Sequence, residues 1–398
     1  MDGQSSEGPV FSRKLMRRAV LVSFAVYFAL GLPDGVFGTV WPTLRNELGR
    51  TDSSFGWLLA CMAVGYTICS VGSAKLSERF GTGLVVRNAS FVVVAGLLGV
   101  AVASNWWALM FGVLIMGAGW GLCDASINAW MALTQQPRQM GLLHGVYGVG
   151  AVLGPLLATV FVAGSNNWRG PFVVVGVLVL GLVVVLWGTK DGFDSAPLTG
   201  EVASARANIG GTKILTLLIV WFSVYVGIEV TVGQWSYTFL TESRGLDEVL
   251  AGALVSAFWG GLTVGRFLLA AIGDRFSPER VMALAIGSAV IEVAFLWVDL
   301  ASVGAFALPF IGFSLAAMFP LVIGRTAVYL GSELAARAVG YQVGASSVGF
   351  VLLPYLVGAL ADHLGTGVMA PVTFAAICVL GVLWAWIQSY LLRVNQNR

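Results

Sequence analysis

Charged side chains are scarce in this chain of 398 residues, because Asp, Glu, Lys and Arg together make up only 11% of it. A soluble domain of this length needs a charged surface, and this chain has too few charges to form one. Hydrophobic residues make up 58% of the sequence and gather in long runs. Runs of about 20 apolar residues suffice to cross the ~30 Å hydrocarbon layer of a membrane. The composition therefore indicates an integral membrane protein whose surroundings are a lipid bilayer.

Histidine and cysteine are also rare, which excludes several kinds of chemistry. Only two histidines, His144 and His363, are present, so His-based catalysis has little to work with. The four cysteines all lie in apolar runs without metal-ligand spacing, as expected for buried thiols. The sequence contains no Ser-His-Asp arrangement, metal cluster or nucleotide-binding loop. We therefore expect no enzyme activity, no cofactor and no metal, and the net charge of +2 gives no reason to expect a nucleic-acid partner.

Twelve apolar segments joined by short polar stretches predict an all-α membrane protein, since the strands of a membrane barrel would alternate in polarity. The predicted transmembrane helices are approximately 18–42, 55–75, 84–104, 107–133, 141–163, 170–189, 213–240, 248–271, 280–298, 303–329, 337–361 and 369–392. The longest polar stretch is rich in Gly, Ser, Ala and Pro, which is typical of a linker. The predicted order is a tail at 1–17, a six-helix bundle at 18–189, a linker at 190–212, a second six-helix bundle at 213–392 and a tail at 393–398.

The distribution of Lys and Arg predicts the orientation, because cytoplasmic loops carry an excess of these residues. If the N-terminus is cytoplasmic, only four of the 22 basic residues lie on the outer side: Arg45, Arg50, Arg169 and Arg244. We therefore expect a protein of the cell membrane with both termini in the cytoplasm, working as a monomer. By the same topology, Trp41, Trp106, Trp107 and Trp168 lie near outer helix ends, where Trp commonly anchors a helix in the membrane interface.

Two carboxyl groups occupy matching places in the two halves. Asp34 lies in the first predicted span and Glu229 in the seventh, and each is followed four residues later by a glycine. A carboxyl group inside a bilayer costs at least about 2.5–3.5 kcal/mol on insertion scales. A chain that bears this cost twice at matching places is expected to use both groups for function.

The two halves match over a longer stretch as well. Gly49 and Arg79 are thirty residues apart, and so are Gly245 and Arg275. Six spans separate the two copies, so both copies start on the same side of the membrane. The halves are therefore parallel repeats related by an axis along the membrane normal.

The turn after span two reads Glu78-Arg79-Phe80-Gly81, and an echo, Asp274-Arg275-Phe276-Ser277, follows span eight. With twelve spans in two halves, these turns resemble the major facilitator superfamily over about 18–392. The resemblance implies two pseudo-symmetric six-helix bundles that rock around a central cavity. It also implies that the acid–Arg turn locks the outward-facing state, which makes Glu78, Arg79, Asp274 and Arg275 candidate gate residues. The first turn departs from the family pattern, since Ala74 stands where glycine is expected, so Asp274 and Arg275 are the better candidates.

Acids in the first and fourth spans, here Asp34 and Asp124, resemble the fucose–galactose–proton symporter branch of that superfamily. The resemblance implies that these acids take part in proton transfer and sugar recognition. Burial disfavours the charged form of a carboxyl group, so such a group can be neutral when closed off and ionised when it faces water. We therefore expect Asp34, Asp124 and Glu229 to couple transport to protons, with sodium as the alternative ion.

The polar residues of the membrane spans suit a small polar solute such as a sugar. Trp120, Asp124 and Asn128 follow one another at intervals of four and so form one stripe on a helix face. Sugars need amides and carboxylates for their hydroxyls and aromatic faces for their C–H side. The candidate solute contacts are Trp120, Asn128, His144, Tyr147, Gln234, Trp235, Trp259 and Gln342.

Each acid also has a structural explanation. Asp34 can cap a helix at a kink, Asp124 can pair with a neighbouring helix for assembly, and Glu229 can form an ion pair with Arg266 or Arg325. The main functional rival is proton-coupled efflux, because Gly141, Gly150, Gly154 and Pro155 match most of a pattern associated with drug–proton antiporters. A less favoured alternative is a membrane sensor that does not transport and needs no coupling acid.

Overall fold

The computed structural model describes residues 10–134, 137–189, 192–193, 212–272, 275–299 and 303–396. Both chain ends, most of the predicted linker at 190–212, and Asp274 lie outside these ranges. The long helices of the N-terminal half are α1 (Val10–Glu47), α2 (Ser54–Phe80), α3 (Thr82–Ala101), α4 (Trp106–Thr134), α5 (Pro137–Ser165) and α6 (Gly170–Trp187). The C-terminal half contains α7 (Thr212–Thr238), α8 (Glu248–Ile272), α9 (Pro278–Val298), α10 (Leu308–Ala316), α11 (Met318–Leu330), α12 (Ser332–Leu364) and α13 (Met369–Gln396).

Three short helical segments complete these elements. The π-helix η3 (Phe239–Ser243) continues α7, while the 3₁₀ segments η6 (Gly304–Ala307) and η7 (Thr366–Val368) precede α10 and α13. In the part of the chain that the structure describes, twelve helices are long and apolar enough to cross a membrane. The tenth comprises η6, α10 and α11, from Gly304 to Leu330. The predicted number of spans and the all-helical fold class are therefore confirmed.

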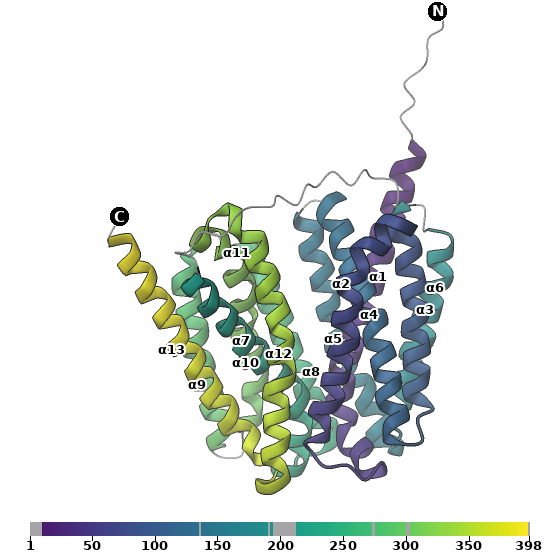
Figure 1. The fold of residues 1–398 in the computed structure, drawn as a ribbon. Coiled ribbons are helices and arrows are strands. Elements are labelled where there is room, and N and C mark those ends of the chain that lie inside the picture. Colours follow the sequence, from purple (N-terminus) through teal and green to yellow (C-terminus); the bar gives the residue numbers. More distant parts are fainter. Residues whose placement is uncertain are drawn as a thin grey trace, which may run out of the picture. The chain divides into compact units, whose positions relative to one another are not determined.

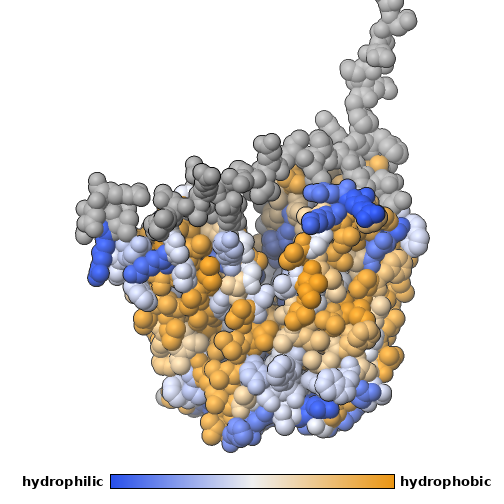
Figure 2. All heavy atoms as spheres, viewed as in Figure 1, coloured by the Kyte–Doolittle hydropathy of each residue, from blue (hydrophilic) through white to orange (hydrophobic). Residues whose placement is uncertain are grey.

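Large apolar side chains lie on the surface of these helices, as a lipid environment requires. Val71 is 79% exposed, Val184 is 68% exposed and Leu284 is 74% exposed. On the visible sides of each unit, apolar residues cover the helices and hydrophilic residues gather near their ends (Figure 2). Helices suit this setting because each one satisfies its backbone hydrogen bonds internally, without water.

The chain divides into two compact units, and the division does not follow the two sequence halves. Unit 1 comprises residues 1–30, 64–147 and 172–201, and unit 2 comprises residues 31–63, 148–171 and 202–398. The second parts of α1 and α5 and the first part of α2 therefore belong to the same compact unit as the C-terminal helices. In unit 1, α3 packs against α4; in unit 2, α7 packs against α12 and α13, and α8 packs against α10 (Figure 1).

The internal repeat is visible in the backbone. Gly49 and Gly245, which end the matching segments, both adopt the left-handed conformation, with φ values of +60° and +64°. Pro155 in α5 and Pro354 in α12 likewise both lie inside long helices. Left-handed backbone favours glycine because it has no Cβ. The correspondence inferred from spacing alone thus extends to local conformation.

The Pro–Gly segment around Asp34 does not interrupt the helix, although Pro and Gly residues commonly loosen a helix. Helix α1 is continuous from Val10 to Glu47 and contains Pro33. The glycines instead allow close helix packing within unit 2: a Cβ at Gly35 would overlap Pro155 of α5, and one at Gly38 would overlap the Gln234 backbone of α7. Asp34 therefore lies where three helices meet closely.

Candidate functional site

Asp124 in α4 is the centre of a hydrogen-bonded cluster in unit 1. Its carboxylate accepts hydrogen bonds from the Tyr27 hydroxyl at 2.6 Å, from the Tyr66 hydroxyl and from the Asn128 amide at 3.1 Å. These donors come from α1, α2 and α4. Among the described residues, Asp124 has no Lys, Arg or His in an ion pair. The carboxylate is therefore held by neutral donors alone, and it is only half-buried.

The predicted polar stripe of α4 and part of α5 belong to the same neighbourhood. The hydrogen bond between Asn128 and Asp124 joins two members of the stripe. Trp120 is buried, and its indole N–H has no hydrogen-bond partner in the described part of the chain. The His144 ring lies edge-on to Tyr27, with 5.6 Å between ring centroids, and Tyr147 is half-buried one turn further along α5. Unit 1 thus gathers carboxylate, amide, hydroxyl and imidazole groups within a few turns of helix.

Glu229 in α7 belongs to a different arrangement, in unit 2. Its carboxylate is paired with the Arg266 guanidinium of α8 at 3.2 Å and accepts a hydrogen bond from the Tyr225 hydroxyl. Arg325, the other predicted partner, is instead paired with Glu279. The charge of Glu229 is therefore compensated, in agreement with the ion-pair alternative drawn from the sequence.

Asp34 lies close enough to Glu229 for their charges to interact. Its backbone carbonyl accepts a hydrogen bond from the Gln234 side chain at 2.5 Å, which ties α1 to α7. The sequence predicted Gln234 as a solute contact, but its side chain is buried and its amide contacts the backbone of Asp34. Asp34, Glu229 and Arg266 are thus three ionisable groups within unit 2.

Three other predicted solute contacts take part in helix packing within unit 2. The Trp235 indole N–H donates to the Pro354 carbonyl at 3.1 Å, and its ring packs edge-on against Phe55. Trp259 lies against Gly233, where a Cβ would overlap its ring. The side-chain oxygen of Gln342 accepts a hydrogen bond from the Thr326 hydroxyl at 3.1 Å, and Gln342 is fully buried. The described contacts of these three residues are thus packing contacts within unit 2, and their role as solute contacts stays a prediction.

The predicted gate residues lie at exposed positions where the structure describes them. Glu78, Arg79 and Arg275 are exposed, and Arg79 contacts the Phe80 ring at 5.1 Å. None of these three residues forms an ion pair with another described residue. Asp274 lies outside the described residues, so the gate role stays a prediction.

An ion-pair network joins helix ends in unit 2. Arg45 at the end of α1 is paired with both Asp52 and Glu242. The Ser53 backbone N–H donates to the Asp362 carboxylate of α12 at 3.3 Å. We call this cluster, Arg45, Asp52, Ser53, Glu242 and Asp362, the closed end of unit 2. From the sequence, Arg45 counts only as an outer-side charge, because its partner Glu242 lies 197 residues further along the chain.

Breaking the Arg45 contacts is expected to open the closed end. The Arg45 side chain is only 13% exposed, so we expect its ion pairs to stabilise the structure more than an ion pair on the surface does. In the rocking motion that the superfamily resemblance implies, Arg45→Gln should shift the population toward a form opened at this end by about tenfold, because about 1–2 kcal/mol of stabilisation is lost. Spin labels at Thr51 and Ser243, both exposed, should then show a growing population at longer distance.

Arg169→Gln is the matched control. Arg169 forms an ion pair of the same type with Glu47 at 2.7 Å, but this pair connects the α5–α6 loop with α1 and so joins two parts of the N-terminal half. It should leave the distance distribution unchanged. An equal response to both substitutions would mean that the network only stabilises the helix ends.

In the described part of the chain, no group of three His, Cys, Asp or Glu side chains is arranged to hold a metal ion. The two acid clusters lie on long membrane-spanning helices, in two sequence halves related by repetition. Such a fold defines a polytopic membrane protein, and ionisable groups inside membrane spans are typical of proteins that move ions or solutes.

The sequence pattern described as Major Facilitator Superfamily matches residues 23–342 and 217–397. The chain belongs to this superfamily.

Individual relatives are distant but cover most of the chain. Bypass of stop codon protein 6 of Saccharomyces cerevisiae is 24% identical and covers 95% of this chain and 83% of its own length. Sodium-dependent glucose transporter 1A of Mus musculus is 23% identical, covering 85% of this chain and 89% of itself. The glucose/galactose transporter of Brucella abortus biovar 1 is 24% identical, covering 90% of this chain and 92% of itself.

Solved structures share the fold at lower sequence identity. A bacterial homologue of the human lysosomal transporter Spinster, in an inward-facing and unoccupied conformation, has a TM-score of 0.75 at 14% identity, covering 97% of this chain and 99% of that one. A D-xylose–proton symporter has a TM-score of 0.71 at 15% identity, covering 92% and 97%. These likenesses establish the major facilitator fold, as the sequence predicted.

Proposed function

We propose that this chain is a secondary transporter that takes up a small polar solute, a sugar, together with a proton by alternating access. The observation that carries the proposal is the Asp124 carboxylate, held by Tyr27, Tyr66 and Asn128 without a cationic partner among the described residues. A carboxylate without a compensating charge is expensive within a membrane span, and such groups mark ion or proton pathways.

The chemistry of the Asp124 cluster suits both a proton and a sugar. The ionised carboxylate accepts hydrogen bonds, whereas the protonated form also donates one. Protonation therefore changes which solute hydroxyls the cluster can bind, and this links proton binding to solute binding. The Asn128 amide and the tyrosine hydroxyls add neutral groups that can contact solute hydroxyls.

Asp34 and Glu229 have different roles in this proposal. Glu229 balances the charge of Arg266, so it is less suited to release a proton than an acid without a cation. Asp34 is the second proton carrier in this proposal, because its carboxyl group lies within the membrane-spanning part of α1, in the same unit as the Glu229–Arg266 pair. The closed end of unit 2 would be one of the two gates of alternating access.

The relatives support sugar as the solute and leave two coupling ions open. Their names include a glucose/galactose transporter and a sodium-dependent glucose transporter, and one structural neighbour is a D-xylose–proton symporter. We favour the proton, because a carboxylate held by neutral hydrogen-bond donors, as Asp124 is, can take up and release a proton by itself. In this proposal the protein lies in the cell membrane with both termini cytoplasmic, and it functions as a monomer without a cofactor.

Purified protein in liposomes tests the proposal directly. We expect labelled D-glucose, D-galactose or D-xylose to accumulate when an inward proton gradient is imposed, and not with a sodium gradient or without any gradient. Accumulation driven by a sodium gradient alone would show that sodium, and not the proton, is the coupling ion. Transport that runs only against the proton flow would favour efflux, and sugar binding without any flux would favour a sensor.

A further inference from the structure

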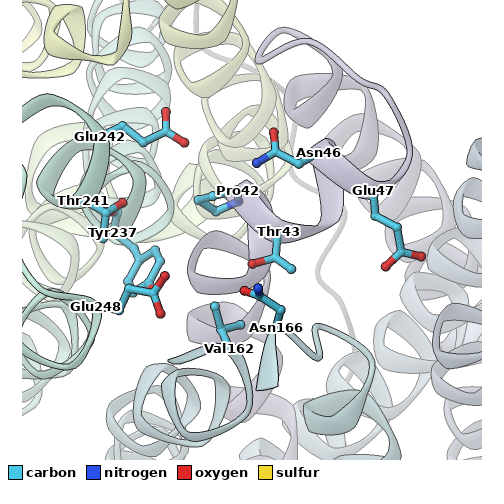
Figure 3. Close-up of a pocket in the computed structure, with 10 residues that line it drawn as sticks. All are labelled: Pro42, Thr43, Asn46, Glu47, Val162, Asn166, Tyr237, Thr241, Glu242 and Glu248. Atoms are coloured by element: carbon cyan, nitrogen blue, oxygen red, sulfur yellow. The ribbon is translucent and has the colours of Figure 1, made fainter. Parts of the chain in front are cut away.

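A polar cavity lies next to the closed end of unit 2, and all the residues that line it belong to that unit. It has a volume of about 450 Å³ and lies between the ends of α1, α5 and α7 and the start of α8. Figure 3 shows Thr43, Asn46 and Asn166 on one side of it, facing Tyr237, Glu242 and Glu248 on the other. Small-molecule sites have volumes of about 300–1,000 Å³, so the cavity has room for a monosaccharide.

Two of the three acids that line this cavity are already compensated. Glu47 pairs with Arg169 at 2.7 Å and accepts a hydrogen bond from the Trp168 indole at 2.8 Å. Glu242 is paired with Arg45. Glu248 is therefore the one acid of the three whose charge no ion pair among the described residues compensates.

The third acid, Glu248, lies in the first turn of α8. It stands at the start of α8, where Asp247 already accepts hydrogen bonds from the N–H groups of Val249 and Leu250 at 2.9 and 3.1 Å. The Glu248 carboxylate has no ion pair or hydrogen bond with another described residue. In Figure 3 it lies at the wall of the cavity, beside Tyr237.

Tyr237 gives an independent indication of a ligand. Its side chain is only 2% exposed, yet its buried hydroxyl has no hydrogen-bond partner in the described part of the chain. Tyr237 lines the cavity, so a bound molecule can supply the missing partner. A buried hydroxyl without a hydrogen-bond partner destabilises the protein, and a ligand that supplies the hydrogen bond recovers this loss.

The donors and acceptors of the cavity select the class of ligand. The Asn46 and Asn166 amides and the Tyr237 hydroxyl can donate, and the Glu248 carboxylate only accepts. An ammonium ion satisfies the carboxylate but offers no acceptor to the donors. Sugar hydroxyls both donate and accept, so a polyhydroxylated solute satisfies both kinds of group.

We infer that this cavity is a second binding site for a small polyhydroxylated solute, in which Glu248 and Tyr237 bind solute hydroxyls. The inference rests on the proposed function for the identity of the solute and adds a site apart from the Asp124 cluster. Glu242 joins this site to the closed end, because one side chain lines the cavity and pairs with Arg45. A solute that engages Glu242 competes with Arg45, so binding here favours opening.

Protection of an engineered cysteine tests the site in the full-length protein. Asn46→Cys places a thiol on the exposed part of the cavity wall, and its rate of labelling by a thiol reagent is measured above the wild-type background. At a sugar concentration ten times the dissociation constant, we expect labelling to slow about tenfold. D-glucose, D-galactose and D-xylose are the probes, and choline is the cationic comparison.

Three variants make the result specific. Ser165→Cys is the matched control, since Ser165 is exposed next to Asn166 but does not line the cavity, and sugar should not protect it. In the Asn46→Cys protein, Glu248→Gln should weaken protection about tenfold and Tyr237→Phe about fivefold, because a charge-assisted and a neutral hydrogen bond are lost.

Several results would overturn the inference. They are absence of protection by a sugar that the wild type transports, protection by choline, and protection unchanged in both Glu248→Gln and Tyr237→Phe. Protection that disappears in an Asp124→Asn background would place the bound sugar at the other cluster. If sugar protects the cysteine but the wild type shows no uptake, the result would support this binding site and contradict the proposed transport function.

Discussion

Asp124→Asn is expected to abolish sugar accumulation driven by a proton gradient while the protein remains folded. Asparagine keeps the shape of the side chain but cannot take up or release a proton. The hydroxyls of Tyr27 and Tyr66 lose their charged acceptor, so sugar binding should also weaken by about tenfold. Proteoliposome uptake should fall to the level of empty liposomes.

Exchange of labelled for unlabelled sugar separates coupling from binding. Exchange needs no net proton movement, so it should persist in Asp124→Asn at raised sugar concentration, with a flatter dependence on pH. Asp34→Asn should show the same separation if Asp34 is the second proton carrier. A variant that loses binding, uptake and exchange together would assign Asp124 to solute recognition alone.

Glu292→Gln is the matched control for these substitutions. Glu292 lies in α9, within a membrane-spanning helix like Asp124, and accepts a hydrogen bond from Ser314 at 3.0 Å. It takes part in none of the hydrogen bonds described for the Asp124 cluster, so uptake should be retained. Accumulation at the wild-type level in both Asp124→Asn and Asp34→Asn would contradict the proposed coupling.

Local spacing made part of the Asp124 cluster predictable. Asp124 and Asn128 are four residues apart, so they share a helix face in any α-helix, and the structure joins them by a hydrogen bond. Tyr27 and Tyr66 were not predictable in the same way, because they lie 97 and 58 residues before Asp124. The contact of Tyr225 with Glu229 was predictable from the sequence, because the two residues are four positions apart in one helix.

The tryptophans near the predicted outer helix ends show where sequence reasoning was wrong. Trp107 is 77% exposed, as an interface anchor would be, but Trp41, Trp106 and Trp168 are buried. Trp41 packs against Phe55, with 4.7 Å between ring centroids, and Trp168 donates to Glu47. A position near a helix end predicts an interface anchor only if no other helix covers it. Packing within unit 2 covers Trp41 and Trp168, and Trp106 is buried within unit 1.

The spans were more predictable than their contacts because hydropathy is a property of each segment. The length and apolar character of a span follow from bilayer thickness, whichever helices surround it. Which glycines allow close approach depends instead on the neighbouring helix, as at Gly38 against Gln234. For this reason the sequence of the Pro–Gly segment of α1 does not by itself indicate that the helix is tightly packed there.

Removing one partner of the Glu229–Arg266 pair is expected to destabilise the protein more than any exposed charge substitution. The two side chains are only 16% and 26% exposed, so the remaining charge would stay largely desolvated. Loss of one partner of a buried pair costs about 3–5 kcal/mol, and the residual exposure places Arg266→Gln and Glu229→Gln nearer about 3 kcal/mol. The apparent unfolding temperature should fall by several degrees in each variant.

The double variant Glu229→Gln, Arg266→Gln should recover much of this loss, because neither buried charge is then left uncompensated. The Arg325–Glu279 pair is the matched control, since its side chains are 32% and 37% exposed and lie in the same unit. Neutralising either of them should cost less than about 1 kcal/mol. Equal losses for both pairs, or no recovery in the double variant, would show that charge compensation is not what Arg266 provides. The double variant can also recover stability without recovering uptake. This result would separate the structural role of the pair from a role in moving protons, because in that variant Asp34 no longer has the charge of Glu229 near it.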